Sequence, residues 1–233
     1  MKYVNRKIFK IDIDDISIIS VLKKIKQNEI LFIVTPNLDH HKKIYENHSL
    51  IRIYNSADLI LNDSRVLFFF TKFFKKKLVN TVRGSDLTEL ILKNSLKKKF
   101  LIFGNLINLE ILKKIYPSNE FFQIKASFNK KRVKNDVLNI LNYINKKNID
   151  YIMLCGGAPY SEKIGYFLKK KNICSNILAV GSSINFIIGK TKRAPKIISK
   201  IGLEWFYRAI IEPRLILRYI SDLKYFYYIF KNL

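Results

Sequence analysis

The sequence predicts an α/β protein: a Rossmann-like, mainly parallel sheet flanked by helices, with a basic helical appendage at the C-terminus. Short apolar, β-rich runs recur along the chain, and each ends in small or polar residues. Stretches with helical spacing lie between most of these runs, and this alternation is typical of a parallel sheet covered by helices. From about residue 191 the sequence becomes basic and aromatic. We therefore expect a core over residues 1–190 and an appendage over residues 191–233.

The expected elements can be placed in chain order. Before the first core strand, the acidic segment 12–14 has the pattern of a hairpin or turn. The clearest helical patterns cover residues 87–98 and 134–147. The basic segment 190–218, punctuated by prolines, is either a C-terminal helix pair with a solvated basic face or a segment selected for phosphate recognition. The six predicted strands are 30–37, 57–63, 99–105, 120–127, 150–157 and 177–183.

The composition bounds the class of protein. With 233 residues and 48% hydrophobic content, the chain can bury one sizeable core. The formal charge of +25 favours nucleic acid or an anionic membrane as partner, but Ala, Gly and Arg are scarce, so AT-rich codon usage accounts for part of the lysine content. No uninterrupted apolar run approaches the roughly 20 residues that span a bilayer, and the N-terminus lacks the apolar core of a signal peptide. We expect a soluble or peripherally attached cytoplasmic protein, with Cys155 and Cys174 reduced in or near the core.

Small and polar residues gather where the predicted strands end. Ligands of parallel α/β sheets bind at those carboxyl ends, so the pattern predicts a nucleotide-type site. Asp63 could act there as a general base, although its position alone favours a helix N-cap. Thr35 and Asn37 could hydrogen-bond a sugar or nucleotide, or cap the next helix. The residues at these ends are Thr35, Asn37, Asp63, Gly156, Gly157, Gly181 and Ser182.

The other candidates are a glycine-rich loop, two adjacent histidines and a few arginines. The loop 155–163 leads into a helix, whose first N–H groups attract phosphate, although a tight turn explains the glycines equally well. His40 and His41 lack partners at metal spacing, and we expect both at the surface. Arg83 suits a diphosphate or a salt bridge with Asp86, which we expect to cap the following helix. Four of the nine arginines fall within 190–218, a selective use of a group suited to phosphate.

Five blocks in this order carry a resemblance to a known family. They are 56–63, 82–87, 150–159, 179–195 and the basic segment around Arg208, Arg214 and Arg218. Together they resemble the WecG/TagA/CpsF glycosyltransferases, glycosyltransferase family 26, over roughly residues 30–220. The resemblance implies that Asp63 is the catalytic base. It implies substrate binding by Thr35, Asn37, Arg83, Gly157, Ser161, Asn185, Arg208, Arg214 and Arg218.

The chain departs from the family pattern at four positions. Ser64 replaces the Gly that follows the base, and its turn can form if φ is negative there. Ser161 replaces a functional Gln and is shorter, so that one contact would be missing or made through water. Asn185 replaces an Asp, and Leu215 replaces an Arg.

The resemblance also sets the expected activity. It implies an inverting transfer of an N-acetylhexosamine, of the ManNAc or ManNAcA type, from a UDP-sugar to a polyprenyl-diphosphate-linked acceptor in cell-surface polysaccharide biosynthesis. Neither a metal nor a cofactor is expected, and the implied place is the inner face of the cytoplasmic membrane, with self-association. The alternatives are a catalytically impaired member that binds nucleotide or lipid diphosphate, and, ranked last, a basic nucleic-acid-binding protein. No nucleic-acid module is recognisable in the sequence, so we expect no nucleic acid as partner.

Overall fold

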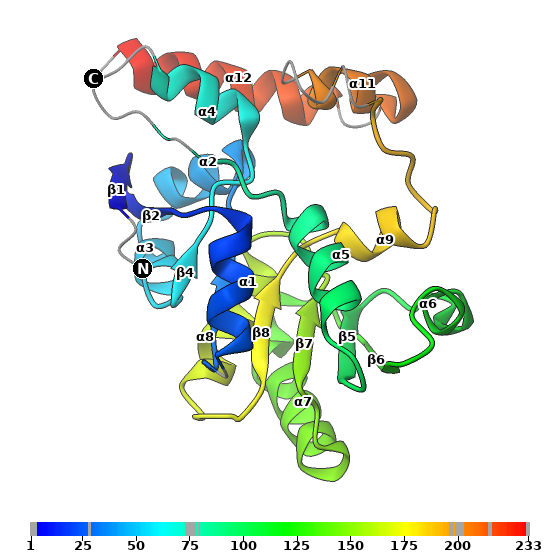
Figure 1. The fold of residues 1–233 in the computed structure, drawn as a ribbon. Helices are drawn as coiled ribbons and strands as arrows, with labels where there is room; N and C mark the ends of the chain where they lie inside the picture. Colours follow the sequence, from blue (N-terminus) through cyan, green and yellow to red (C-terminus); the bar gives the residue numbers. More distant parts are fainter. Residues whose placement is uncertain are drawn as a thin grey trace.

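The computed structural model is built around a six-stranded, fully parallel sheet in the order β4-β3-β8-β7-β5-β6 (Figure 1). It describes residues 4–27, 29–72, 78, 80–195, 198, 203–213 and 216–231. Each predicted core strand is present, and the predicted Rossmann-like α/β class is confirmed. The strands are β3 (Phe32–Val34), β4 (Leu59–Ile60), β5 (Lys99–Gly104), β6 (Glu120–Lys125), β7 (Tyr151–Leu154) and β8 (Asn176–Ala179).

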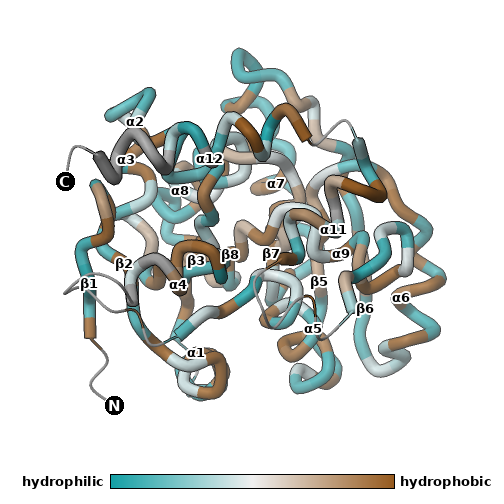
Figure 2. Tube along the Cα trace, turned by 90° about the horizontal axis from the view of Figure 1, so that it is seen from above, coloured by the Kyte–Doolittle hydropathy of each residue, from teal (hydrophilic) through white to brown (hydrophobic). Residues whose placement is uncertain are grey.

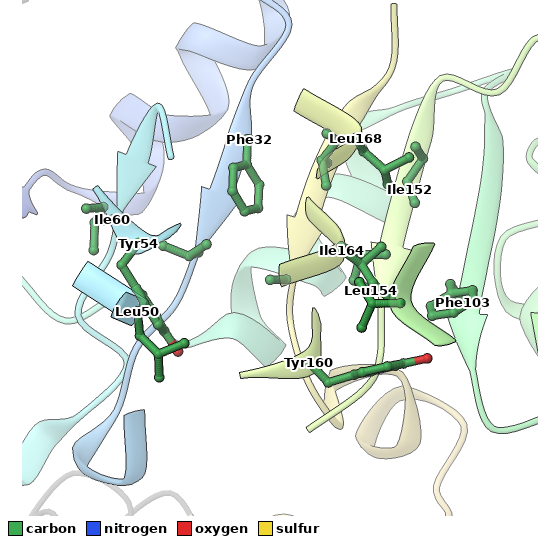
Figure 3. Close-up of a cluster of buried hydrophobic side chains, with 14 of the residues drawn as sticks. Phe32, Leu50, Tyr54, Ile60, Phe103, Ile152, Leu154, Tyr160, Ile164 and Leu168 are labelled. Carbon is green, nitrogen blue, oxygen red and sulfur yellow. The ribbon is translucent and has the colours of Figure 1, made fainter. Parts of the chain in front are cut away.

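Helices cover both faces of the sheet, because side chains along each strand alternate between two apolar clusters. In β5, Leu101 and Phe103 face one cluster, while Phe100 and Ile102 face the other. The first cluster, shown in Figure 3, contains side chains of α2 (Leu38–Glu46), α3 (Ser49–Tyr54), α7 (Val133–Lys147) and α8 (Tyr160–Lys169). The second contains side chains of α1 (Ile18–Lys26), α5 (Gly84–Asn94) and α6 (Leu109–Ile115). The remaining core helices are α4 (Arg65–Lys72), α9 (Ser183–Ile187) and a 3-10 turn, Lys130–Arg132.

Gly165 lets α8 lie directly on β3, and this contact gives a first prediction. A Cβ atom at Gly165 would lie 2.3 Å from Cε2 of Phe32, which is almost completely buried. Gly165→Ala is therefore expected to lower the free energy of unfolding by about 1–3 kcal/mol, despite the better helix propensity of Ala. Urea denaturation measures the change. Gly157→Ala is the matched control, because nothing lies within 4 Å of its added Cβ, and equal losses in the two variants would contradict the prediction.

The expected hairpin before the first core strand is present. The strands β1 (Val4–Ile8) and β2 (Ile11–Asp15) pair in antiparallel register. Asp14, whose side chain points back toward the sheet, accepts a hydrogen bond of 2.8 Å from the backbone N–H of Ile60 in β4. The Asp14 side chain of the hairpin therefore occupies a backbone N–H on the outer edge of β4, where another strand could otherwise pair.

Two C-terminal helices, α11 (Glu204–Ile211) and α12 (Ile216–Lys231), lie over the carboxyl ends of the strands (Figures 1 and 2). Polar contacts attach α12 to α2: Lys42 Nζ lies 2.6 Å from Ser221 Oγ, and Tyr225 donates its hydroxyl to the carbonyl of His41 at 3.1 Å. In the part of the chain that the structure describes, no helix is long and apolar enough to cross a bilayer. The division of the chain at residue 190 stays a prediction.

Candidate active site

A cavity of about 550 Å³ opens at the carboxyl ends of the strands, and residues of α11 and α12 also line it. The loop after β3 contributes Thr35 and Asn37, and the loop after β4 contributes Asp63. Trp205 of α11 and Arg218 of α12 complete the lining from above. The loops after β7 and β8 supply Gly156, Gly157, Gly181 and Ser182, and α9 supplies its first residue, Ser183. The sheet thus brings together residues that lie far apart in the sequence.

Asp63 faces this cavity and does not cap the helix that follows it. Ser64 fills the N-cap position of α4, because its Oγ accepts a 3.1 Å hydrogen bond from the Leu67 N–H. Ser64 is not among the described residues with positive φ, so its turn forms without the replaced glycine. The N-cap interpretation of Asp63 is therefore wrong. Its Oδ1 accepts a 3.3 Å hydrogen bond from the N–H of Gly84.

The surroundings of Asp63 favour its protonated form. Burial raises the pKa of the Asp63 carboxyl well above its ordinary value, and the nearby Glu204 carboxylate raises it further. The Gly84 N–H and the Arg83 guanidinium oppose this shift and only partly offset it. A carboxylate whose pKa is raised in a cavity is a stronger proton acceptor than a free one, as a general base requires.

Arg83 lies beside Asp63 and is held between two acidic side chains. Its Nε lies 2.7 Å from Asp86 Oδ2, and its Nη1 lies 3.1 Å from Glu204 Oε2 in α11. The predicted salt bridge with Asp86 is confirmed. The predicted capping of α5 by Asp86 is wrong, because the helix begins at Gly84 and Asp86 lies in its first turn.

Thr35 and Asn37 have intramolecular partners as well as a face on the cavity. Thr35 Oγ1 donates a 3.3 Å hydrogen bond to the carbonyl of Ala179 in β8. Asn37 caps α2, since its Oδ1 accepts from the His40 N–H at 3.4 Å. The capping interpretation of Asn37 is confirmed, and its place in the cavity lining leaves the binding role as a prediction.

Two of the predicted binding residues lie in or next to the glycine-rich loop, and only one of them lines the cavity. Gly157 lines the cavity, and nothing lies within 4 Å of a Cβ atom added to it. Ser161 is buried behind the loop and is not part of the lining: its Oγ accepts a 2.9 Å hydrogen bond from the Gly156 N–H. The hydroxyl of Ser161 therefore holds the loop, and the predicted ligand contact has no counterpart in this geometry.

The remaining candidates differ in where they lie. Asn185 of α9 and Arg218 line the cavity. The Arg208 side chain and all of Arg214 lie outside the described residues, so their predicted roles stay predictions. Cys155 lines the cavity as a free thiol whose pKa burial raises to about 12, whereas Cys174 is exposed, contrary to expectation. Among the residues that the structure describes, no cluster of three or more His, Cys, Asp or Glu side chains could hold a metal ion.

The expectation that both histidines lie at the surface is wrong. His41 is buried at 2% exposure. His40 lines the cavity, and its Nε2 lies 3.3 Å from Oε1 of Glu162, a buried residue in the first turn of α8. Sequence reasoning missed this pair because its members are far apart in the chain and come from α2 and α8. A signal was present in Glu162, an acid at the start of a helix that follows a glycine-rich loop.

A parallel α/β sheet with a polar cavity at its carboxyl ends defines a ligand-binding protein of the nucleotide-binding type. A carboxyl with a raised pKa beside an arginine suits that cavity to group transfer. The chain belongs to the WecG/TagA/CpsF family of glycosyl transferases, whose family model matches residues 6–233. The predicted family and the predicted glycosyltransferase class are thereby confirmed.

Three relatives share one name, N-acetylglucosaminyldiphosphoundecaprenol N-acetyl-beta-D-mannosaminyltransferase. The relative from Bacillus spizizenii is 29% identical over 209 residues, which cover 85% of this chain and 78% of the relative. The relative from Bacillus subtilis strain 168 is 27% identical over 74% of this chain and 68% of its own length. The relative from Staphylococcus aureus strain NCTC 8325 is 24% identical over 88% of this chain and 84% of its own length.

Proposed function

We propose that this protein transfers an N-acetylhexosamine, of the ManNAc or ManNAcA type, from a UDP-sugar to a polyprenyl-diphosphate-linked sugar, with inversion at the anomeric carbon. The observation that carries the proposal is Asp63, a partly buried carboxyl with a raised pKa in the cavity at the carboxyl ends of the strands. The relatives support the acceptor, because their name describes mannosaminyl transfer to N-acetylglucosaminyl diphosphoundecaprenol. The product would be an intermediate in the assembly of a cell-surface polysaccharide.

In this reaction, the Asp63 carboxylate removes the proton from the attacking hydroxyl of the acceptor. The oxygen then forms a bond to the anomeric carbon of the donor sugar as the bond to the β-phosphate oxygen breaks. The bonding electrons leave with UDP, and the proton remains on Asp63. One displacement from the face opposite the leaving group inverts the anomeric centre. Arg83 stabilises the negative charge that develops on the diphosphate.

A lipid-linked acceptor requires the cavity to approach a membrane, and α11 and α12 would form that side of the protein. Both helices carry exposed apolar side chains, among them Phe206 at 52%, Ile210 at 63% and Leu217 at 78% exposure. Exposed apolar side chains together with the exposed Arg218 and Lys224 of α12 suit the interface of an anionic membrane. We include peripheral attachment to the inner face of the cytoplasmic membrane in the proposal, and self-association stays a prediction.

Release of UDP from a panel of UDP-N-acetylhexosamines, with and without a short-chain polyprenyl-diphosphate-GlcNAc acceptor, tests the proposed function. We expect release that depends on the acceptor, and NMR of the product should show an anomeric configuration opposite to that of the donor. UDP binding without turnover of any donor would favour a catalytically impaired family member. Binding to nucleic acid that weakens steeply with salt, without UDP binding, would favour the nucleic-acid alternative.

Glu204 makes the pH dependence of this activity predictable. A general base acts only when ionised, so the rate should rise with pH through the raised pKa of Asp63. Because the Glu204 carboxylate raises that pKa, Glu204→Gln should lower it and move the acidic limb of kcat/KM to lower pH. A pH profile measures the shift. Glu89→Gln removes a carboxylate that pairs with Lys93 and Arg193 outside the cavity, and an equal shift in this control would refute the explanation.

A further inference from the structure

We propose that Glu162, held in place by His40, recognises the sugar of the donor by accepting a hydrogen bond from one of its hydroxyls or from its acetamido N–H. The proposal rests on the proposed function, because it concerns the same cavity and the same donor. It assigns to Glu162 a specificity role that is separate from the proton transfer at Asp63.

The first support is the burial of Glu162 against the cavity. Glu162 is only 3% exposed, yet it lines the cavity together with His40. Its Oε1 is engaged by His40 Nε2 at 3.3 Å. Its Oε2 is buried and has no hydrogen-bond partner within the described part of the chain. A buried carboxylate oxygen without a partner is costly, so the site favours a ligand that donates a hydrogen bond to it.

The second support is the way His40 is fixed. A carboxylate only accepts hydrogen bonds, so Nε2 of His40 must carry the proton that lies between it and Glu162. On the other side of the ring, Nδ1 contacts Asn37, the residue that caps α2, whose backbone N and Oδ1 lie 3.3 and 2.7 Å away. The ring is therefore oriented from α2, and it orients the carboxylate on α8. Among the described residues, none hydrogen-bonds Oε2 of Glu162, so this oxygen is the acceptor that remains for a ligand.

The third support is charge, which determines the part of the donor that Glu162 can face. A fixed carboxylate repels a diphosphate and attracts neutral O–H and N–H groups. Glu162 also lies in the first turn of α8, where its negative charge offsets the positive end of the helix. The diphosphate is therefore expected toward Arg83 and Arg65, which lie close together in the cavity lining, and the sugar toward Glu162.

Calorimetric measurement of the affinities for UDP and for UDP-N-acetylmannosamine tests the proposal, because the ratio of the two affinities isolates the contribution of the sugar. Glu162→Gln should weaken the binding of UDP-N-acetylmannosamine by about tenfold or more, because the amide oxygen stays with His40 Nε2 and an NH2 group replaces the Oε2 acceptor, while UDP binding stays within about twofold. Glu110→Gln is the matched control, since Glu110 is exposed on α6, pairs with Lys113 and does not line the cavity. It should leave both affinities unchanged.

Two results would overturn the proposal: an unchanged affinity of Glu162→Gln for the sugar nucleotide, or an equal loss for UDP and the sugar nucleotide. If the variant does not fold, the proposal is tested by measuring the binding of deoxy analogues of the donor sugar to the wild-type protein. One analogue should bind about tenfold more weakly than the parent, and equal binding of all analogues would overturn the proposal. A wild-type protein that binds UDP but does not discriminate among the analogues refutes only this inference. A wild-type protein that binds neither UDP nor the sugar nucleotide refutes the proposed function as well.

Discussion

Asp63→Asn is expected to lower kcat by about 10²–10⁴-fold, because an amide cannot take the proton of the acceptor hydroxyl. The substitution preserves shape and the acceptor oxygen that receives the Gly84 N–H, so the loop after β4 should keep its conformation. UDP binding is expected to stay within about twofold of wild type, since the altered group acts on the acceptor and not on the nucleotide. Steady-state UDP release and calorimetric UDP binding measure the two effects.

The free energy of unfolding of Asp63→Asn provides the control for its activity. The raised pKa of Asp63 means that the folded protein binds this proton more tightly than the unfolded chain. Its contribution to stability is therefore complete below the ordinary carboxyl pKa and declines as pH rises toward the raised value. The amide that replaces the carboxyl carries no such cost of ionisation, so Asp63→Asn should be at least as stable as wild type at neutral pH. An inactive variant that is also less stable would indicate a structural role for Asp63 instead.

Arg83→Gln is expected to lower kcat/KM by about 10²–10³-fold, the usual effect of removing one donor that stabilises developing negative charge. Loss of the guanidinium removes a cation from the cavity and leaves Asp86 and Glu204 without this partner. Since Arg83 lowers the pKa of Asp63, its removal should also raise that pKa and move the acidic limb of the rate profile to higher pH. Kinetics across a pH series measure both effects.

Arg193→Gln is the matched control for Arg83→Gln. Arg193 also pairs with Asp86, and it contacts Glu89, but it does not line the cavity. Its loss is expected to change kcat/KM by less than about threefold, as for a partly exposed salt bridge. If the two variants lost activity equally, the effect would come from the position of α5 and not from charge in the cavity.

The strands and their polar ends could be predicted from the sequence because both are local patterns. The run that contains β5, for example, has a continuous apolar stretch between a lysine and a glycine, which is typical of a buried strand. The order β4-β3-β8-β7-β5-β6 could not be predicted in this way. Strand order depends on contacts between distant segments, and the alternation of strand and helix leaves several orders open.

The site was predictable to the extent that its residues end a strand. Asp63 and Thr35 could be placed at one edge of the sheet from sequence alone. The cap at Ser64 was missed, since adjacent Asp and Ser both favour the N-cap position and only the structure shows which hydroxyl or carboxylate accepts. Two ion pairs, His40 with Glu162 and Arg83 with Glu204, each join distant segments, so no spacing pattern in the sequence predicts them.

The N-terminal hairpin affects strand pairing between two copies of this chain. An unpaired sheet edge is a template for strand addition from another molecule, and β4 is short enough to leave its outer backbone groups available. The Asp14 carboxylate occupies the N–H of Ile60 on that edge, with the hairpin packed beside it. Among the described strands of the main sheet, edge-to-edge pairing is therefore left to β6, whose ends carry Glu120 and Lys125. At the β4 edge, one carboxylate therefore occupies a backbone donor that an added strand would need.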